Sequence, residues 1–141
     1  MACGERILKK LTQTEKTFRK LKGIESLTNE LKDEILYEVS AKRFEYTFES
    51  LWKTVKVFLE EEKGIICNSP MDCFKQFYKT MNLDEKFEDK IPKTVRFRNE
   101  IMHIYDYETA EFIYKNLENN VIPLFEEIIV NIKNYCQGKG G

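Results

Sequence analysis

The sequence has few of the residues that interrupt helices and very little histidine. Its 141 residues include only 6 glycines, 3 prolines and a single histidine. So little glycine and proline, in a chain that is 42% hydrophobic and 33% charged, excludes a fibrous or disordered protein. The sequence also lacks an uncharged apolar run of the roughly 20 residues that a membrane-spanning helix needs. We expect a helix-rich globular protein with no transmembrane segment.

The chain also lacks a strong charge of either sign. It carries 23 basic and 24 acidic residues, for a net charge of -1. Such a chain does not attract nucleic acid through its overall field, so any contact with RNA must be local. The first residues enter a charged helical pattern without the apolar core of a signal peptide, and we therefore expect a cytoplasmic protein without membrane contact.

The four cysteines form no C-x-x-C pair, and one histidine cannot complete the usual zinc ligand sets. We expect no metal and no cofactor. In a cytosolic protein the thiols are expected to be reduced, and a disulfide between the two nearest cysteines, Cys67 and Cys73, is not expected. The remaining two are Cys3 and Cys136.

Apolar residues recur at steps of three and four, which is the helical period. The pattern predicts helices from near the start to Gly23, from about Asp33 to Lys63 with a stop at Gly64, and from about Pro70 to Met81 behind a Ser69 cap. A fourth helix is predicted in the segment around Ile91-Pro92, with Val95, Ile101 and Met102 on it. A last helix is predicted to begin at an Asp106 cap, continue through Ile132 and bend at Pro123.

These segments and the absence of strand patterns predict an all-α protein. We expect an antiparallel up-and-down helical bundle of about five helices with a four-helix-bundle core. Residues 1–137 are expected to form a single domain, and residues 138–141 a disordered tail.

One short run of residues, called the string below, contains the candidate catalytic side chains. Arg98-Asn99 is followed by His103 and Tyr105 in an Arg-Asn-x-x-x-His-x-Tyr pattern that contains the only histidine. Histidine exchanges protons near neutral pH, and arginine stabilises the charge that builds on a phosphate. Asn99 could orient either group. The set suits metal-independent cleavage of RNA, because DNA lacks the 2′-hydroxyl nucleophile.

Spacing alone does not bring these groups together. On an ideal helix Arg98 and His103 point roughly 140° apart. Either the helix ends near His103, or the two groups meet across a two-fold dimer interface. The structural alternative is that the histidine packs beside an aromatic residue and that Arg96 or Arg98 pairs with Glu100 or with a neighbouring helix.

A second motif lies in the long predicted helix. Glu49 and Lys53 are four residues apart in the favourable order for a helical ion pair, and Glu45 lies on the same face as Glu49. We interpret Trp52 as a core residue. Glu45, Glu49 and Lys53 could instead border a cleft and position the Arg98 side chain.

Together these two motifs resemble a known family. The run from Phe44 to Lys56, FEYTFESLWKTVK, followed downstream by Arg98-Asn99-x-x-x-His103-x-Tyr105-Asp106, resembles the nucleotidyltransferase substrate-binding protein family, a branch of the HEPN superfamily. The resemblance extends from about Leu36 to Tyr114. It implies a dimeric helical bundle whose partner is a separate minimal nucleotidyltransferase.

The resemblance also implies roles for the string. Arg98, Asn99 and His103 match a metal-independent RNase site, and such pairs act as toxin and antitoxin. Tyr105 matches a tyrosine to which the transferase attaches AMP, which silences the toxin. Three hypotheses remain open: an RNase toxin, a non-catalytic substrate-binding or regulatory subunit of the transferase, and an interaction bundle without either activity.

Overall fold

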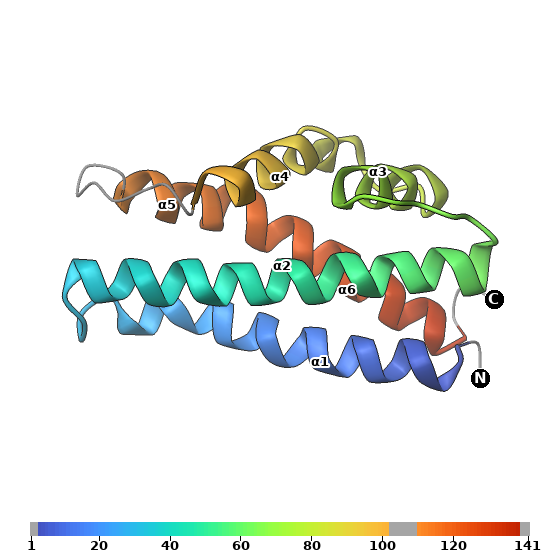
Figure 1. Ribbon diagram of the computed structural model, residues 1–141, viewed down its shortest axis with the longest axis horizontal. Coiled ribbons are helices and arrows are strands. Elements are labelled where there is room, and N and C mark those ends of the chain that lie inside the picture. The colour runs from blue at the N-terminus through green and yellow to red at the C-terminus, as the bar shows by residue number, and fades with distance from the viewer. Residues whose placement is uncertain (1–2, 102–109, 139–141) are drawn as a thin grey trace.

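The computed structural model describes residues 3–101 and 110–138. These residues are almost entirely helical and contain no strand, as expected for an all-α protein. The helices, shown in Figure 1, are α1 (Glu5–Lys22), α2 (Asp33–Lys63), α3 (Pro70–Thr80), α4 (Lys90–Ile101), α5 (Ala110–Asn116) and α6 (Ile122–Cys136).

The two N-terminal helices lie side by side, joined by a connection that begins with a short 3₁₀ turn (Gly23–Leu27). The colour gradient in Figure 1 runs in opposite directions along α1 and α2. Helix α2 has the predicted bounds and is 31 residues long. It ends because Gly64 adopts a left-handed conformation with φ of 67°, which glycine tolerates without steric cost.

Helix α3 begins at the predicted cap. The Ser69 side chain accepts a hydrogen bond from the Asp72 amide at 3.2 Å, and Pro70 occupies the start of the helix, where its missing N–H costs nothing. The helix ends at Thr80, one residue before the predicted end. The fourth helix, α4, is described up to Ile101, so His103 and Tyr105 lie outside the described residues.

Near Pro123, where the sequence predicts a bend, the helix type changes. A π-helical turn (Leu117–Val121) separates α5 from α6 immediately before this proline. Pro123 has no N–H to donate to the Asn119 carbonyl four residues earlier. Lys90 of α4 donates to that carbonyl instead, at 2.7 Å. The start predicted for the last helix, at Asp106, lies outside the described residues.

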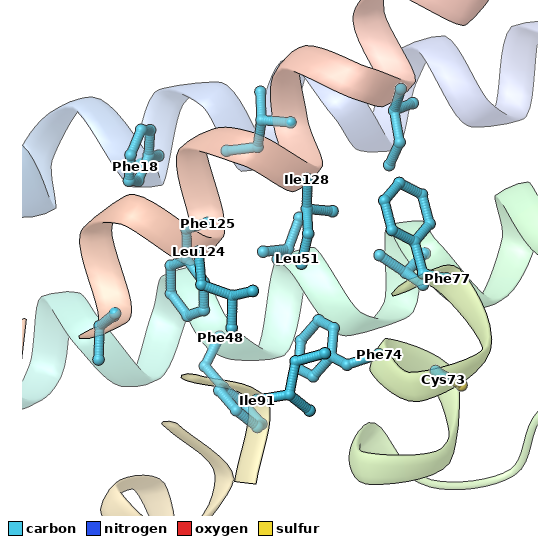
Figure 2. Packing of buried hydrophobic residues seen from close by; sticks show 14 of the residues in the cluster. Phe18, Phe48, Leu51, Cys73, Phe74, Phe77, Ile91, Leu124, Phe125 and Ile128 are labelled. Atoms are coloured by element: carbon cyan, nitrogen blue, oxygen red, sulfur yellow. The ribbon is translucent and has the colours of Figure 1, made fainter. Parts of the chain in front are cut away.

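Phenylalanine rings from several helices form the centre of the core (Figure 2). Phe48 of α2 lies 5.7 Å from Phe74 of α3 and 6.4 Å from Phe125 of α6, between ring centroids. All three side chains are fully buried. Burying one such side chain is worth about 1.5–3 kcal/mol, so this cluster holds α2 firmly against the helices that surround it.

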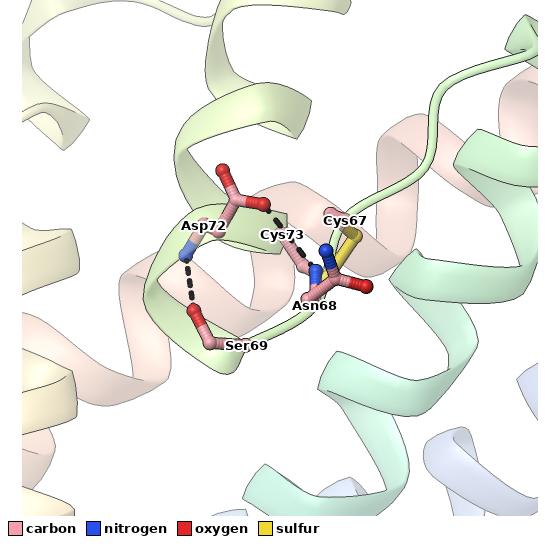
Figure 3. Close-up of a disulfide and its surroundings, with 5 residues drawn as sticks. All are labelled: Cys67, Asn68, Ser69, Asp72 and Cys73. Carbon is pink, nitrogen blue, oxygen red and sulfur yellow. Dashed lines mark hydrogen bonds between the residues drawn. A yellow bond between two sulfur atoms is a disulfide. The ribbon is translucent and has the colours of Figure 1, made fainter.

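The expectation of reduced thiols was wrong. Cys67 and Cys73 form a disulfide, which Figure 3 shows at the start of α3. The connection after Gly64 turns back onto this helix, and the Asp72 carboxylate accepts a hydrogen bond from the Asn68 amide at 3.3 Å. The two Cα atoms are therefore 5.1 Å apart, within bonding range.

A second disulfide joins Cys3 to Cys136, with 4.9 Å between the Cα atoms. It ties the segment before α1 to the last turn of α6. Neither disulfide could be predicted from the cysteine spacing, because spacing does not show that the two ends of the chain meet. Disulfides are typical of oxidising compartments and of hyperthermophilic intracellular proteins, so they do not favour the predicted cytoplasmic location.

No helix among residues 3–101 and 110–138 is both long enough and apolar enough to cross a bilayer. Of the tail predicted to be disordered, residues 138–141, only Gly138 belongs to the described residues.

Candidate active site

The candidate site is built around Arg98, which α4 presents to the middle of α2. Arg98 Nη2 donates to Glu49 Oε1 at 2.5 Å. The guanidinium also lies over the ring of Phe48, with its central carbon 5.3 Å from the ring centroid. Phe48 is fixed in the aromatic core, so Arg98 is held by one carboxylate and one immobile aromatic face.

The carboxylate that holds Arg98 is itself positioned by its own helix. Glu49 Oε2 accepts from Trp52 Nε1 at 3.2 Å and lies 3.9 Å from Lys53 Nζ. These partners are three and four residues further along α2, the spacing that places side chains on one face. One oxygen of Glu49 therefore faces Arg98, and the other is occupied within α2.

Trp52 has two roles. It is half-buried and packs against the core, as the sequence predicts, and its indole N–H also orients Glu49. Lys56 Nζ, one turn further along α2, lies 5.9 Å from the Trp52 ring centroid.

The geometry leaves Arg98 available to a ligand. Its side chain is 37% exposed and that of Glu49 is 32% exposed. A guanidinium has five N–H donors, and among the described residues the contact with Glu49 uses one of them. Planar, oriented donors match the oxygens of a phosphate or carboxylate better than the point charge of a lysine does. The site can thus bind an anionic group in a defined orientation.

The structure brings together only some of the residues that the sequence singled out. Glu49 and Lys53 lie with Arg98 in one network. Glu45 is half-buried one turn earlier on α2, and within the described part of the chain no hydrogen bond or ion pair joins it to Arg98. Asn99 is exposed on α4, next to Arg98. The other two candidates, His103 and Tyr105, are not among the described residues.

The basic residues upstream of Arg98 serve the fold more than the site. Lys90 donates to the carbonyl freed by Pro123, and Lys93 pairs with Asp89 at 3.0 Å. Arg96 is exposed. One part of the structural alternative holds, because Arg98 pairs with Glu49 of a neighbouring helix and not with Glu100.

Sequence reasoning missed the part that Phe48 plays under the guanidinium. The signal was present, because Phe48, Glu49, Trp52 and Lys53 lie close together in sequence on one helix. It also missed a groove beside the site between α1 and α2, whose lining includes Glu49. Within the described part of the chain, no group of three or more histidine, cysteine or acidic side chains could hold a metal ion.

A family model matches most of the chain, and solved structures share its fold. The family model described as "Nucleotidyltransferase substrate binding protein like" matches residues 9–134. A protein of known crystal structure from Thermus thermophilus is 25% identical, with a TM-score of 0.71, over 82% of this chain and 95% of that one. No curated protein matches the chain.

A second solved structure is a tri-AMPylated HEPN toxin from Shewanella oneidensis in complex with its MNT antitoxin. It is 16% identical, with a TM-score of 0.72, and the alignment covers 93% of this chain and 98% of the toxin. At this identity the likeness shows a shared fold.

Proposed function

Because the chain belongs to the nucleotidyltransferase substrate binding protein like family, we propose that it is the HEPN-type partner of a separate minimal nucleotidyltransferase and cleaves RNA without a metal. The observation that carries this proposal is the fixed, half-exposed guanidinium of Arg98 between Glu49 and Phe48. A cation held in this way is pre-organised for charge that develops on a phosphate.

In the proposed reaction, His103 removes the proton of a ribose 2′-hydroxyl, and the oxygen attacks the adjacent phosphorus. The bond from phosphorus to the 5′-oxygen breaks, and the leaving oxygen takes up a proton. Arg98 stabilises the negative charge that accumulates on the phosphoryl oxygens, and Asn99 orients the phosphate or the imidazole. One cyclic phosphate end and one 5′-hydroxyl end result.

We propose that the active form is a homodimer of antiparallel up-and-down bundles. A helical spacing of five residues separates Arg98 and His103 by roughly 140°, so one chain does not bring them together while the helix continues. Two-fold pairing would place the string of one protomer opposite that of the other, and it would supply a second histidine to the shared site.

We also propose that the transferase silences the enzyme at Tyr105. The tyrosine oxygen would attack the α-phosphorus of ATP, form a phosphodiester to AMP and release pyrophosphate. The bound nucleotide adds a negative charge and considerable volume two residues from His103, where substrate phosphate must bind. Support comes from the Shewanella protein, which is AMPylated and bound to an MNT antitoxin.

The family description favours a second candidate, a non-catalytic subunit that binds substrate for the transferase. In this function the same Arg98 site would hold the anionic group of a nucleotide or present Tyr105 to the transferase, and no RNA would be cut.

Expression without any transferase separates the two candidates. Wild type and His103→Ala, with Tyr105 shown by intact mass to be unmodified, are incubated with mixed RNA in excess chelator. We expect wild type alone to cut. If neither protein cuts while both fold equally, the RNase proposal is wrong and the substrate-binding function replaces it.

A further inference from the structure

The positive charge of this protein is concentrated on its first helix. Residues 5–22, which form α1, include seven lysines and arginines but only two glutamates, a net charge of +5 in a chain whose total is -1. The rest of the chain is therefore acidic on balance, and α1 is a local source of positive field.

Several of these cations are available to an anion in solution. Counting 100° per residue, Lys9 and Lys16 project away from the apolar stripe that contains the buried Ile7, and Lys10 lies at the edge of that stripe. Within the described part of the chain, neither Lys10 nor Lys16 forms an ion pair. Lys9 lies 3.7 Å from Glu5, but both side chains are more than three-quarters exposed, so this pair is weak.

Two of these lysines border a groove of about 330 Å³ between α1 and α2, whose lining is Lys9, Lys10, Gln13, Glu49, Ser50 and Lys53. The groove floor is rigid, because the Thr14 hydroxyl shares hydrogen bonds with Ser50 at 2.7 Å and with Thr54 at 2.9 Å. A stable distance between α1 and α2 keeps cations from both helices within reach of one extended anion.

The groove borders the candidate site. Glu49 lines the groove and is also the residue that holds Arg98. RNA bound along Lys9, Lys10 and Lys53 would pass this carboxylate, whose charge is offset by Arg98 and Lys53, on its way to the guanidinium.

An exposed aromatic residue lies on the same face of α2. Tyr46 is 61% exposed, and it lies three residues before Glu49 and four before Ser50 on the helix. A solvent-exposed ring beside lysines is the combination with which proteins hold single-stranded nucleic acid, the cations contacting phosphates and the ring stacking on a base.

The surface around the connection between α3 and α4 has the opposite charge. A depression there is lined by Asp84, Glu85, Glu88 and Asp89, together with two lysines, Lys75 and Lys86. This region would repel a polyanion. Lys75 and Lys79 are exposed on the neighbouring α3 and serve as charge-matched controls.

We infer that the surface formed by Lys9, Lys10, Gln13, Tyr46 and Lys53 binds the backbone of single-stranded RNA and delivers it to Arg98. Of these residues, Lys9, Lys10, Gln13 and Lys53 line the α1/α2 groove, and Tyr46 lies about one turn before it on α2. The inference rests on the proposed RNase function for the identity of the ligand, and it adds the route by which the RNA enters.

The test measures binding and cleavage separately. Binding of a fluorescent single-stranded 12-mer RNA is followed by anisotropy on a His103→Ala background, so that no substrate is consumed, between about 50 and 200 mM salt. Lys9→Gln/Lys10→Gln is compared with Lys75→Gln/Lys79→Gln, and circular dichroism melting verifies that both fold.

We expect the groove pair of substitutions to weaken binding and to reduce the slope of log K against log salt by about 1.4, the value for two lost phosphate contacts to a single strand. The α3 pair should leave the slope unchanged. Tyr46→Ala should weaken binding about fivefold or more without changing the slope, because base stacking is not an ionic contact.

Equal effects of the two lysine pairs, or no effect of either, would overturn the groove assignment. So would loss of transferase association in the groove variant with unchanged RNA binding, because the face would then dock the protein partner. Failure of the RNase function is a separate result: wild type would bind RNA through the groove and leave it uncut.

Discussion

Arg98 and the lysines of α1 carry the same charge under opposite constraints. Arg98 is 37% exposed, is bonded to Glu49 and lies over a buried ring. The side chain of Lys9 is 78% exposed, and its one ion pair among the described residues is with an equally solvated glutamate. A fixed cation stabilises charge at one position, whereas mobile cations neutralise a polyanion at many.

This difference indicates separate roles for the two kinds of cation. Electrostatic catalysis needs donors that are already oriented when charge develops, so the constraint on Arg98 favours the chemical step. Binding of a nucleic acid backbone depends mainly on released counterions and tolerates loose geometry. Changes at Arg98 should therefore alter cleavage rate, and changes along α1 should alter affinity.

The largest effect is expected from Arg98→Lys. A lysine keeps the charge but lacks the planar donors and cannot contact Glu49 and Phe48 in the same way. The single-turnover rate of RNA cleavage should fall about 100-fold or more, while RNA affinity changes little. The control is Arg96→Lys on the exposed face of the same helix. Similar losses in both variants would show that Arg98 has no special position.

Glu49→Gln should have the next largest effect. It removes the charge that anchors the guanidinium and leaves a side chain of nearly the same shape. We expect cleavage to slow about tenfold, which corresponds to about 1.4 kcal/mol. RNA affinity should hold or rise, because a negative charge leaves the groove. Glu45→Gln, which changes the glutamate one turn earlier, should match wild type, and an equal effect of both substitutions would contradict the positioning role.

A smaller effect is expected from Trp52→Phe. This change keeps the apolar packing and removes the N–H that donates to Glu49 at 3.2 Å. A hydrogen bond of this kind contributes about 1 kcal/mol, so cleavage should slow about fivefold. Thermal unfolding should stay close to wild type. Unchanged cleavage with a lowered melting temperature would show that Trp52 only supports the core.

The smallest effect on cleavage is expected from removing the disulfides, which lie away from the Arg98 network. In a chain-entropy estimate, the Cys3–Cys136 bond stabilises by about 5 kcal/mol and the Cys67–Cys73 bond by about 2 kcal/mol, since their sequence separations are 133 and 6. Paired serine substitutions should lower the melting temperature in that order. Cleavage well below the melting temperature should be unchanged, and a proportional loss would link the site to overall stability.

Much of the fold could be predicted from local sequence signals. The bounds of α2 were correct because Gly64 and the long apolar stripe mark them within the helix itself. The π-helical turn before Pro123 was only partly predictable, since its free carbonyl is satisfied by Lys90 from a distant helix. The disulfides were missed for the same reason, because they depend on tertiary proximity.

The candidate site, too, could be predicted only in part from the sequence. The sequence identified Glu49, Lys53 and Arg98 as residues of interest, and a contact between Glu49 and Arg98 was one hypothesis among several. The distance between them depends on how α4 crosses α2, which no spacing within one helix reveals. Only the crossing of α4 over α2 shows that the buried Phe48 ring supports the guanidinium.

The proposed cleavage of RNA at the Arg98 site proceeds by attack of a 2′-hydroxyl. The most direct measurement uses a short RNA with one preferred cleavage position and the same RNA with a single 2′-deoxy substitution there, each incubated with the unmodified protein in chelator. We predict a 2′,3′-cyclic phosphate and a 5′-hydroxyl end from the first RNA and no cut at that position in the second. Cleavage of the deoxy position at an equal rate would contradict the account.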